Sequence, residues 1–132
     1  MKSQTITVFI DAPVERVYAF ASNPENLPRW VPSFFRSIRR DHEAWIVDSP
    51  LGEACFSFVA INSFGVLDHH IRLPSGLEFY NPMRVIANGT GSEIMLTLFQ
   101  TAAMSETDFA RDAAAVRNDL ELLKGLLEVE AD

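Results

Sequence analysis

The sequence predicts an α+β domain in which a curved antiparallel sheet of six to seven strands packs around a long C-terminal helix, with two short helices between the first two strands. Three observations predict this arrangement. A run rich in β-branched residues occupies residues 4–10. Further runs of strand length, separated by tight-turn residues, fill residues 34–101. Residues 105–129 then carry one apolar stripe at helical spacing.

Length and composition indicate a single domain over residues 1–132. The chain has 132 residues, of which 48% are hydrophobic and 22% are charged. This balance is typical of a globular domain with one apolar core. We therefore expect no linker and no second domain.

Two helix starts follow the first predicted strand. Asp11 is expected to cap, and Pro13 to begin, a short helix over residues 13–21. Asn23, followed by a proline, repeats this signal and predicts a second short helix that ends near Trp30.

Six runs in the middle of the chain are predicted to be strands. Because short turns separate them, consecutive strands should pair antiparallel. Pro82 interrupts the fifth run, and we expect a bulge or an edge position there. The runs cover residues 34–40, 44–48, 53–61, 66–73, 77–87 and 92–101.

The last element is predicted to be a helix over residues 105–129. Ser105 followed by Asp108 is typical of a helix start. The apolar stripe consists of Phe109, Ala113, Val116, Leu120, Leu123 and Leu127. Charged residues, Asp112 and Asp119 among them, are expected on the other faces. The stripe also fits a coiled-coil seam, but the sheet needs a cover, which favours packing within the chain.

The predicted elements imply an internal space. An antiparallel sheet of this size twists and curls, so it cannot touch a straight helix along its whole length. Large side chains must close the gap, or a cavity remains. The two short helices are well placed to plug one end. We therefore expect an apolar cavity between the sheet and the last helix.

Several segments together carry a family resemblance that spans nearly the whole chain. They are Asp11-Ala12-Pro13 and residues 14–20, 23–30, 88–93 and 105–129. On these segments the chain resembles the helix-grip superfamily, also called START-like or SRPBCC, which includes birch-pollen-allergen-like proteins and polyketide cyclases. Residues 81–85 are also similar to a segment of uncharacterised bacterial members.

The resemblance implies a deep apolar cavity and leaves three functions open. The first is the binding of a small hydrophobic molecule, such as a lipid, hormone or flavonoid. The second is a polyketide cyclase- or dehydratase-type enzyme, which needs a polarising or titrating group in the cavity. The third is a protein-partner module of chaperone-activator or antitoxin-like kind, which predicts a filled interior and an exposed apolar patch around Met95 and Phe99.

Strand parity and aromatic content select candidate ligand-binding residues. His69 shares an apolar face with Leu67 and Ile71, so it is expected inside, as a hydrogen-bonding group or a weak catalytic candidate. Asn81 shares a face with Phe79 and is expected as a second polar group inside. The candidates are Trp30, Phe34, Phe58, His69, Phe79, Asn81, Met83, Leu96, Phe109, Val116 and Leu120.

Charge and motif content exclude several classes. The chain has 18 acidic and 11 basic residues, a formal charge of −7, so nucleic acid is not an expected partner. No apolar run is long enough for membrane insertion. No phosphate-binding, nucleophile or metal-ligand spacing appears, so no metal or cofactor is expected. We expect a cytoplasmic monomer or homodimer in which Cys55 is a buried structural thiol.

Overall fold

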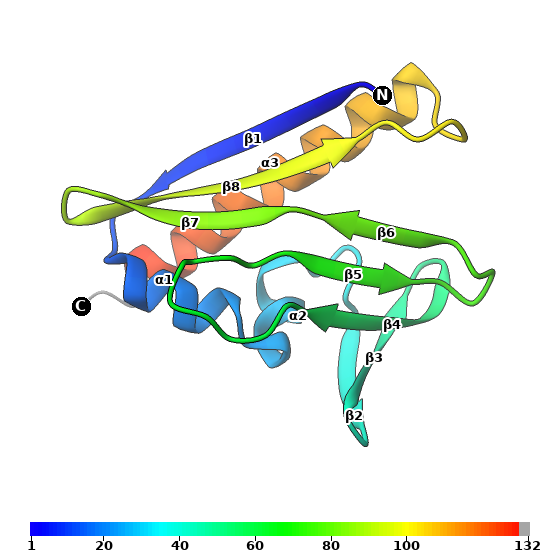
Figure 1. Ribbon diagram of the computed structural model, residues 1–132, viewed down its shortest axis with the longest axis horizontal. Helices are drawn as coiled ribbons and strands as arrows, with labels where there is room; N and C mark the ends of the chain where they lie inside the picture. Colours follow the sequence, from blue (N-terminus) through cyan, green and yellow to red (C-terminus); the bar gives the residue numbers. More distant parts are fainter. Residues whose placement is uncertain (130–132) are drawn as a thin grey trace.

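The computed structural model describes residues 1–129, and its elements follow the predicted order (Figure 1). The strands are β1 (Ser3–Ile10), β2 (Ser37–Asp41), β3 (Ala44–Ser49), β4 (Gly52–Phe58), β5 (His69–Arg72), β6 (Glu78–Asn81), β7 (Met83–Asn88) and β8 (Gly91–Phe99). The helices are α1 (Val14–Ala21), the 3-10 turn η1 (Pro24–Asn26), α2 (Leu27–Trp30) and α3 (Glu106–Val129). The predicted α+β architecture, with two short helices after the first strand, is confirmed.

The strands are all paired antiparallel and form two hydrogen-bonded groups, in the order β1-β8-β7 and β2-β3-β4-β5-β6. The described strands exceed the predicted six to seven because Pro82 divides the fifth predicted run into β6 and β7. β6 pairs with β5, whereas β7 pairs with β8. Proline has no N–H to donate to a ladder, and the Pro82 carbonyl accepts a hydrogen bond from the Thr97 N–H at 2.9 Å. The interruption predicted at Pro82 is therefore the point where the chain crosses between the two groups of strands.

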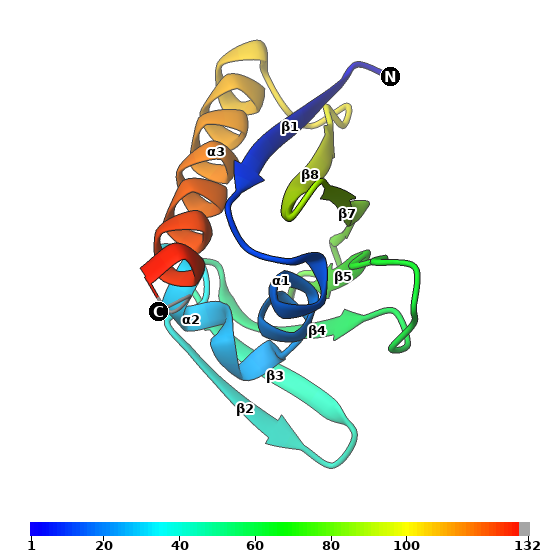
Figure 2. The ribbon, with the colours of Figure 1, turned by 90° about the vertical axis from the view of Figure 1, so that its left-hand side faces the viewer.

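The two groups of strands curve around α3, which lies along one side of them (Figure 2). At 1.5 Å per residue its 24 residues span ~36 Å. The Ser105 hydroxyl accepts a hydrogen bond from the Asp108 N–H at 3.0 Å, as the sequence predicts for the helix start. Near the other end, Arg16 donates to the Leu127 carbonyl and Lys124 donates to the Phe9 carbonyl at 3.0 Å. These bonds tie α3 to α1 and to β1. No helix within residues 1–129 is long and apolar enough to cross a membrane.

The two short helices start differently from each other. The prediction that Asp11 caps α1 is wrong: the residue before the helix is Pro13, and the Asp11 N–H donates to the Glu128 carboxylate at 2.8 Å. The backbone of Asp11 is therefore bonded to α3. Asn23 does act as a cap, because its side-chain oxygen accepts from the Glu25 N–H at 3.1 Å.

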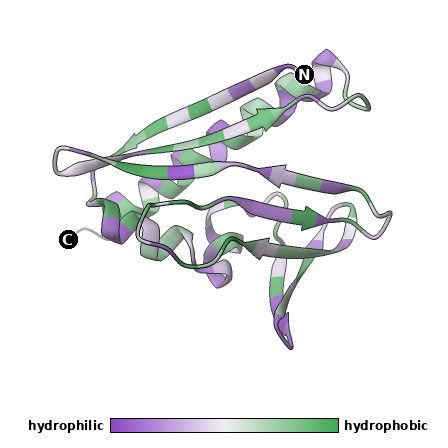
Figure 3. Ribbon diagram, viewed as in Figure 1, coloured by the Kyte–Doolittle hydropathy of each residue, from purple (hydrophilic) through white to green (hydrophobic). Residues whose placement is uncertain are grey.

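Strand parity places the predicted inner faces inward. The buried members are Leu67, His69, Ile71, Leu73, Met83, Val85, Ile94 and Leu96. The hydropathy colouring shows the resulting alternation along the strands (Figure 3). Phe99, expected on the outer face, is 39% exposed. The prediction of a buried thiol at Cys55 is wrong, because its neighbours Ala54 and Phe56 occupy the inner face of β4 and Cys55 is exposed.

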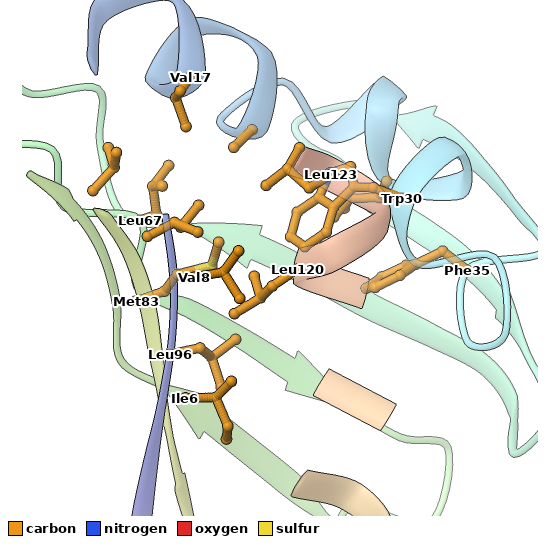
Figure 4. Packing of buried hydrophobic residues seen from close by; sticks show 14 of the residues in the cluster. Ile6, Val8, Val17, Trp30, Phe35, Leu67, Met83, Leu96, Leu120 and Leu123 are labelled. Carbon is orange, nitrogen blue, oxygen red and sulfur yellow. The ribbon is translucent and has the colours of Figure 1, made fainter. Parts of the chain in front are cut away.

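The core lies between the sheet, the short helices and the second half of α3. Figure 4 shows Trp30 beside Leu123 and Leu120, with Val8 and Met83 facing them from the strands. These side chains are at most 5% exposed. Packing is therefore dense at the α1 end of the molecule. The first half of α3 lies farther from this end.

Candidate functional site

A cavity of about 510 Å³ lies between α3, α2 and strands β4, β5, β6 and β8. Small-molecule pockets have volumes of roughly 300–1,000 Å³, so this space suits a drug-sized molecule. It lies where the sequence predicts a gap, between the curved sheet and the straight helix.

The closed end of the cavity is apolar, and the open end is marked by exposed side chains. Buried lining residues are Leu27, Trp30, Phe35, Ile71, Leu96 and Leu120. The exposed large apolar or aromatic ones are Met1, Leu51, Tyr80 and Phe99. The exposed group comes from the chain start, the β3–β4 turn, β6 and the end of β8, all remote from α1 (Figure 1). A ligand would therefore enter from that end.

His69 is a buried polar group in the cavity wall, 8% exposed. Its Nδ1 lies 3.1 Å from the Leu67 carbonyl oxygen. A carbonyl can only accept, so Nδ1 carries the proton and Nε2 keeps a lone pair. Burial lowers the pKa of His69 from 6.5 to about 4, which leaves the ring neutral. His69 is thus suited to accept a hydrogen bond and is a poor base at neutral pH.

Asp119 is a half-buried carboxyl group in the wall formed by α3. Burial raises its pKa from 3.8 to about 7. In the described part of the chain Asp119 forms no hydrogen bond and no ion pair. Asp112, one heptad earlier, also lines the cavity, and burial and the charge of Asp108 raise its pKa. The cavity therefore has an acidic side.

Trp30 contributes a hydrogen-bond donor without a partner. The residue is 3% exposed and lines the cavity. Its indole Nε1 is buried and has no acceptor among residues 1–129. A buried donor left unpaired costs about 1–3 kcal/mol. An acceptor atom on a bound molecule would offset this cost.

The chain is similar in fold to several solved structures, whereas neither a protein-family model nor a curated protein sequence matches it. Ara h 8.0201 is 13% identical, with a TM-score of 0.71 over 96% of this chain and 97% of that one. A START superfamily protein from Mycobacterium smegmatis is 14% identical, with a TM-score of 0.67 over 96% of this chain and 97% of that one. The chain has the START-like helix-grip fold. DynU16, from the dynemicin biosynthetic locus, is 14% identical with a TM-score of 0.72, and the match covers 97% of this chain and 48% of DynU16.

Most of the candidate residues line the cavity of this helix-grip fold. They are Trp30, Phe34, Phe58, His69, Phe79, Asn81, Leu96, Val116 and Leu120. Met83 and Phe109 do not. Met83 follows the crossing at Pro82, pairs opposite Leu96 and packs in the core at 1% exposure. Phe109 is buried in the first turns of α3, with the Lys2 ammonium 5.8 Å from its ring centre.

The two acids that α3 contributes to the cavity wall are residues that the sequence did not single out. Asp112 and Asp119 were expected on outer faces of the last helix, and the structure places both in the cavity wall. They flank Val116 with spacings of four and three residues, the same spacing as the apolar stripe. This spacing is the signal that marks them. A search for apolar residues misses both acids, because the cavity is lined by a wider face of α3 than the face that packs in the core.

Proposed function

We propose that this protein binds a small, mainly hydrophobic molecule in the cavity between its sheet and α3. The observation that carries this proposal is the open interior volume of about 510 Å³ behind a largely apolar wall. Protein interiors are normally close-packed, with few voids larger than a water molecule. A space of this size costs packing energy that a ligand would restore.

The wall provides both affinity and orientation. Apolar area buried by a ligand contributes ~25 cal/mol per Å², and the aromatic rings Phe34, Phe58 and Phe79 supply much of that area. His69 offers an acceptor at Nε2, and Trp30 offers a donor at Nε1. Few polar groups in an apolar pocket are typical of small-molecule sites.

The alternatives receive less support. The protein-partner module requires a filled interior, whereas the helix-grip interior here is open. The cyclase- or dehydratase-type enzyme was expected to use His69 as a polarising or titrating group, and burial, which lowers its pKa to about 4, makes its imidazole a weak base near neutrality. We therefore propose binding as the function and His69 as an orienting group.

The experiment is a titration of the folded protein with Nile red, a neutral hydrophobic dye, followed by fluorescence. Saturable binding at one dye per chain is expected. Val116→Trp places a large ring in the wall and should weaken binding at least tenfold, because Val116 lines the cavity. Leu122→Trp is the matched control, since Leu122 lies on the same helix, is 41% exposed and does not line the cavity.

Circular dichroism confirms that each variant is folded before the dye is added. No saturable binding to the folded parent protein would reject the proposal. Undiminished binding to Val116→Trp would reject the cavity as the site. An equal loss in Leu122→Trp would do the same, because it would place the dye on the outer surface of α3.

A further inference from the structure

The acidic side of the cavity belongs to one face of α3. Asp112 and Asp119 are seven residues apart, so they lie on the same side of the helix with a drift of only about 20°. Both line the cavity, and neither forms a hydrogen bond or an ion pair within residues 1–129. Asp112 is exposed and lies beside Arg111, whereas Asp119 is half-buried. An unpaired carboxyl group is costly to bury, so the position of Asp119 is unfavourable while no cation is near it.

The rest of the cavity wall offers no cation to these acids. No lysine or arginine side chain lines it in the part of the chain that the structure describes. His69, from β5, is neutral because burial lowers its pKa to about 4. From β6, Glu78 already accepts a hydrogen bond from Arg72 at 2.8 Å.

The remaining titratable groups in the wall are also accounted for. The Tyr80 hydroxyl donates to Asp68 at 2.8 Å, which raises the pKa of Tyr80 and keeps it uncharged. The amino group of Met1 lies at the exposed mouth, where Met1 is 90% exposed. Burial raises the pKa of Asp119, and no compensating charge acts on this carboxyl group within residues 1–129.

A second, independent feature also points to a ligand with polar atoms. Trp30 belongs to α2, which packs against α3. It is 3% exposed, and its Nε1–H is buried without an acceptor in the part of the chain that the structure describes. A purely hydrocarbon ligand would leave this donor and Asp119 both unpaired. The cavity is therefore shaped for a molecule that is mainly apolar and carries a polar group.

We propose that the ligand is a hydrophobic molecule bearing a protonated amine, and that Asp119 pairs with the ammonium group. This inference rests on the proposed function and names its ligand class. Asp112, nearer the mouth, adds attraction of the same sign. A ligand with an anionic head, such as a carboxylate, would meet two like charges and bind poorly.

Pairing with an ammonium group favours the ionised carboxyl group. Because the pKa of Asp119 is about 7, roughly half of the free protein at neutral pH carries a proton there. Binding of the amine displaces that proton into solvent, so amine affinity should rise with pH through this range.

The test compares three ligands that share one apolar body: 2-naphthylmethylamine, 2-naphthylmethanol and 2-naphthoate. Each is measured by displacement of Nile red at pH 8. We expect the amine to bind about tenfold more tightly than the alcohol, as for a hydrogen-bonded charge, and the carboxylate more weakly than the alcohol. In Asp119→Asn the amine-to-alcohol affinity ratio should fall to about one.

Glu121→Gln is the matched control, because it removes one negative charge from an exposed position of the same helix outside the cavity. The ratio should persist in this variant. The parent protein should also lose the ratio at pH 5, where Asp119 is protonated while the amine keeps its charge.

Each outcome is decisive. Nile red binding with no amine preference overturns the ligand class and leaves the proposed function intact. No Nile red binding overturns both. A preference that survives in Asp119→Asn or at pH 5, or that disappears equally in Glu121→Gln, removes Asp119 from its role.

Discussion

Replacing Asp119 by asparagine should stabilise the ligand-free protein, and the gain should depend on pH. The carboxyl group has a folded-state pKa of about 7 against an ordinary 3.8, because burial disfavours its charge. Between these values the folded state holds a proton that the unfolded state has lost. The contribution of Asp119 to the unfolding free energy therefore falls as pH rises from about 4 to about 7, and levels off above that.

The size of this effect follows from the pKa difference. A rise from 3.8 to about 7 corresponds to an upper value of about 4 kcal/mol, at about 1.36 kcal/mol per pKa unit. Asp119 is only half-buried, so solvent screening reduces the expected effect to about 1–2 kcal/mol. Asparagine has no proton to lose, so Asp119→Asn lacks this loss of stability.

Urea denaturation of both proteins at pH values from 4 to 8 measures the effect. The stability of Asp119→Asn minus that of the parent should grow by about 1–2 kcal/mol over this range, and most of the growth should come before pH 7. All other titrating groups are common to both proteins and cancel. Glu121→Gln, at an exposed position, should show a nearly constant difference. A constant difference for Asp119→Asn as well would refute the unpaired, half-buried carboxyl group.

Two further predictions concern a turn and the buried donor. Gly65→Ala should destabilise the protein by about 3 kcal/mol or more, because φ is +71° and a Cβ would lie 2.2 Å from the Val85 carbonyl oxygen. Gly76→Ala, with φ +90° and open space, should cost only about 1–2 kcal/mol, and equal urea midpoints for the two variants would contradict the steric argument. Trp30→Phe removes the unpaired Nε1–H and should lower the affinity ratio of 2-acetylnaphthalene to 2-ethylnaphthalene about fivefold, measured by Nile red displacement. An unchanged ratio would mean that Trp30 donates nothing to the ketone.

The fold could be predicted from the sequence because its signals are local and periodic. The stripe from Phe109 to Leu127 defines one helix, and turn residues divide the middle of the chain into strands. Proline chemistry alone locates the interruption at Pro82. Strand parity then places His69 and Ile94 on the inner side, because alternation needs no knowledge of the tertiary contacts.

The site could be predicted only in part, because parity tells inside from outside and nothing more. Met83 points inward like Phe79, yet one packs in the core and the other lines the cavity. The difference depends on the local distance between sheet and helix, which the strand sequence does not encode. Asp119 lies beside the apolar stripe, and the helix pattern cannot tell how wide a face the sheet leaves uncovered.

The crossing at Pro82 governs how the cavity mouth is bounded. On the α1 side, backbone hydrogen bonds join the two groups of strands. The Leu67 N–H donates to the Met83 carbonyl at 2.8 Å, and the Val85 N–H donates to the Gly65 carbonyl at 3.0 Å. On the other side β6 and β8 belong to separate ladders in the described chain. Hydrogen bonds therefore join the two groups of strands at the α1 end, whereas at the cavity mouth the two groups belong to separate ladders. The mouth is bounded by side chains such as Tyr80 and Phe99, which are exposed, so residue size there governs which molecules can pass.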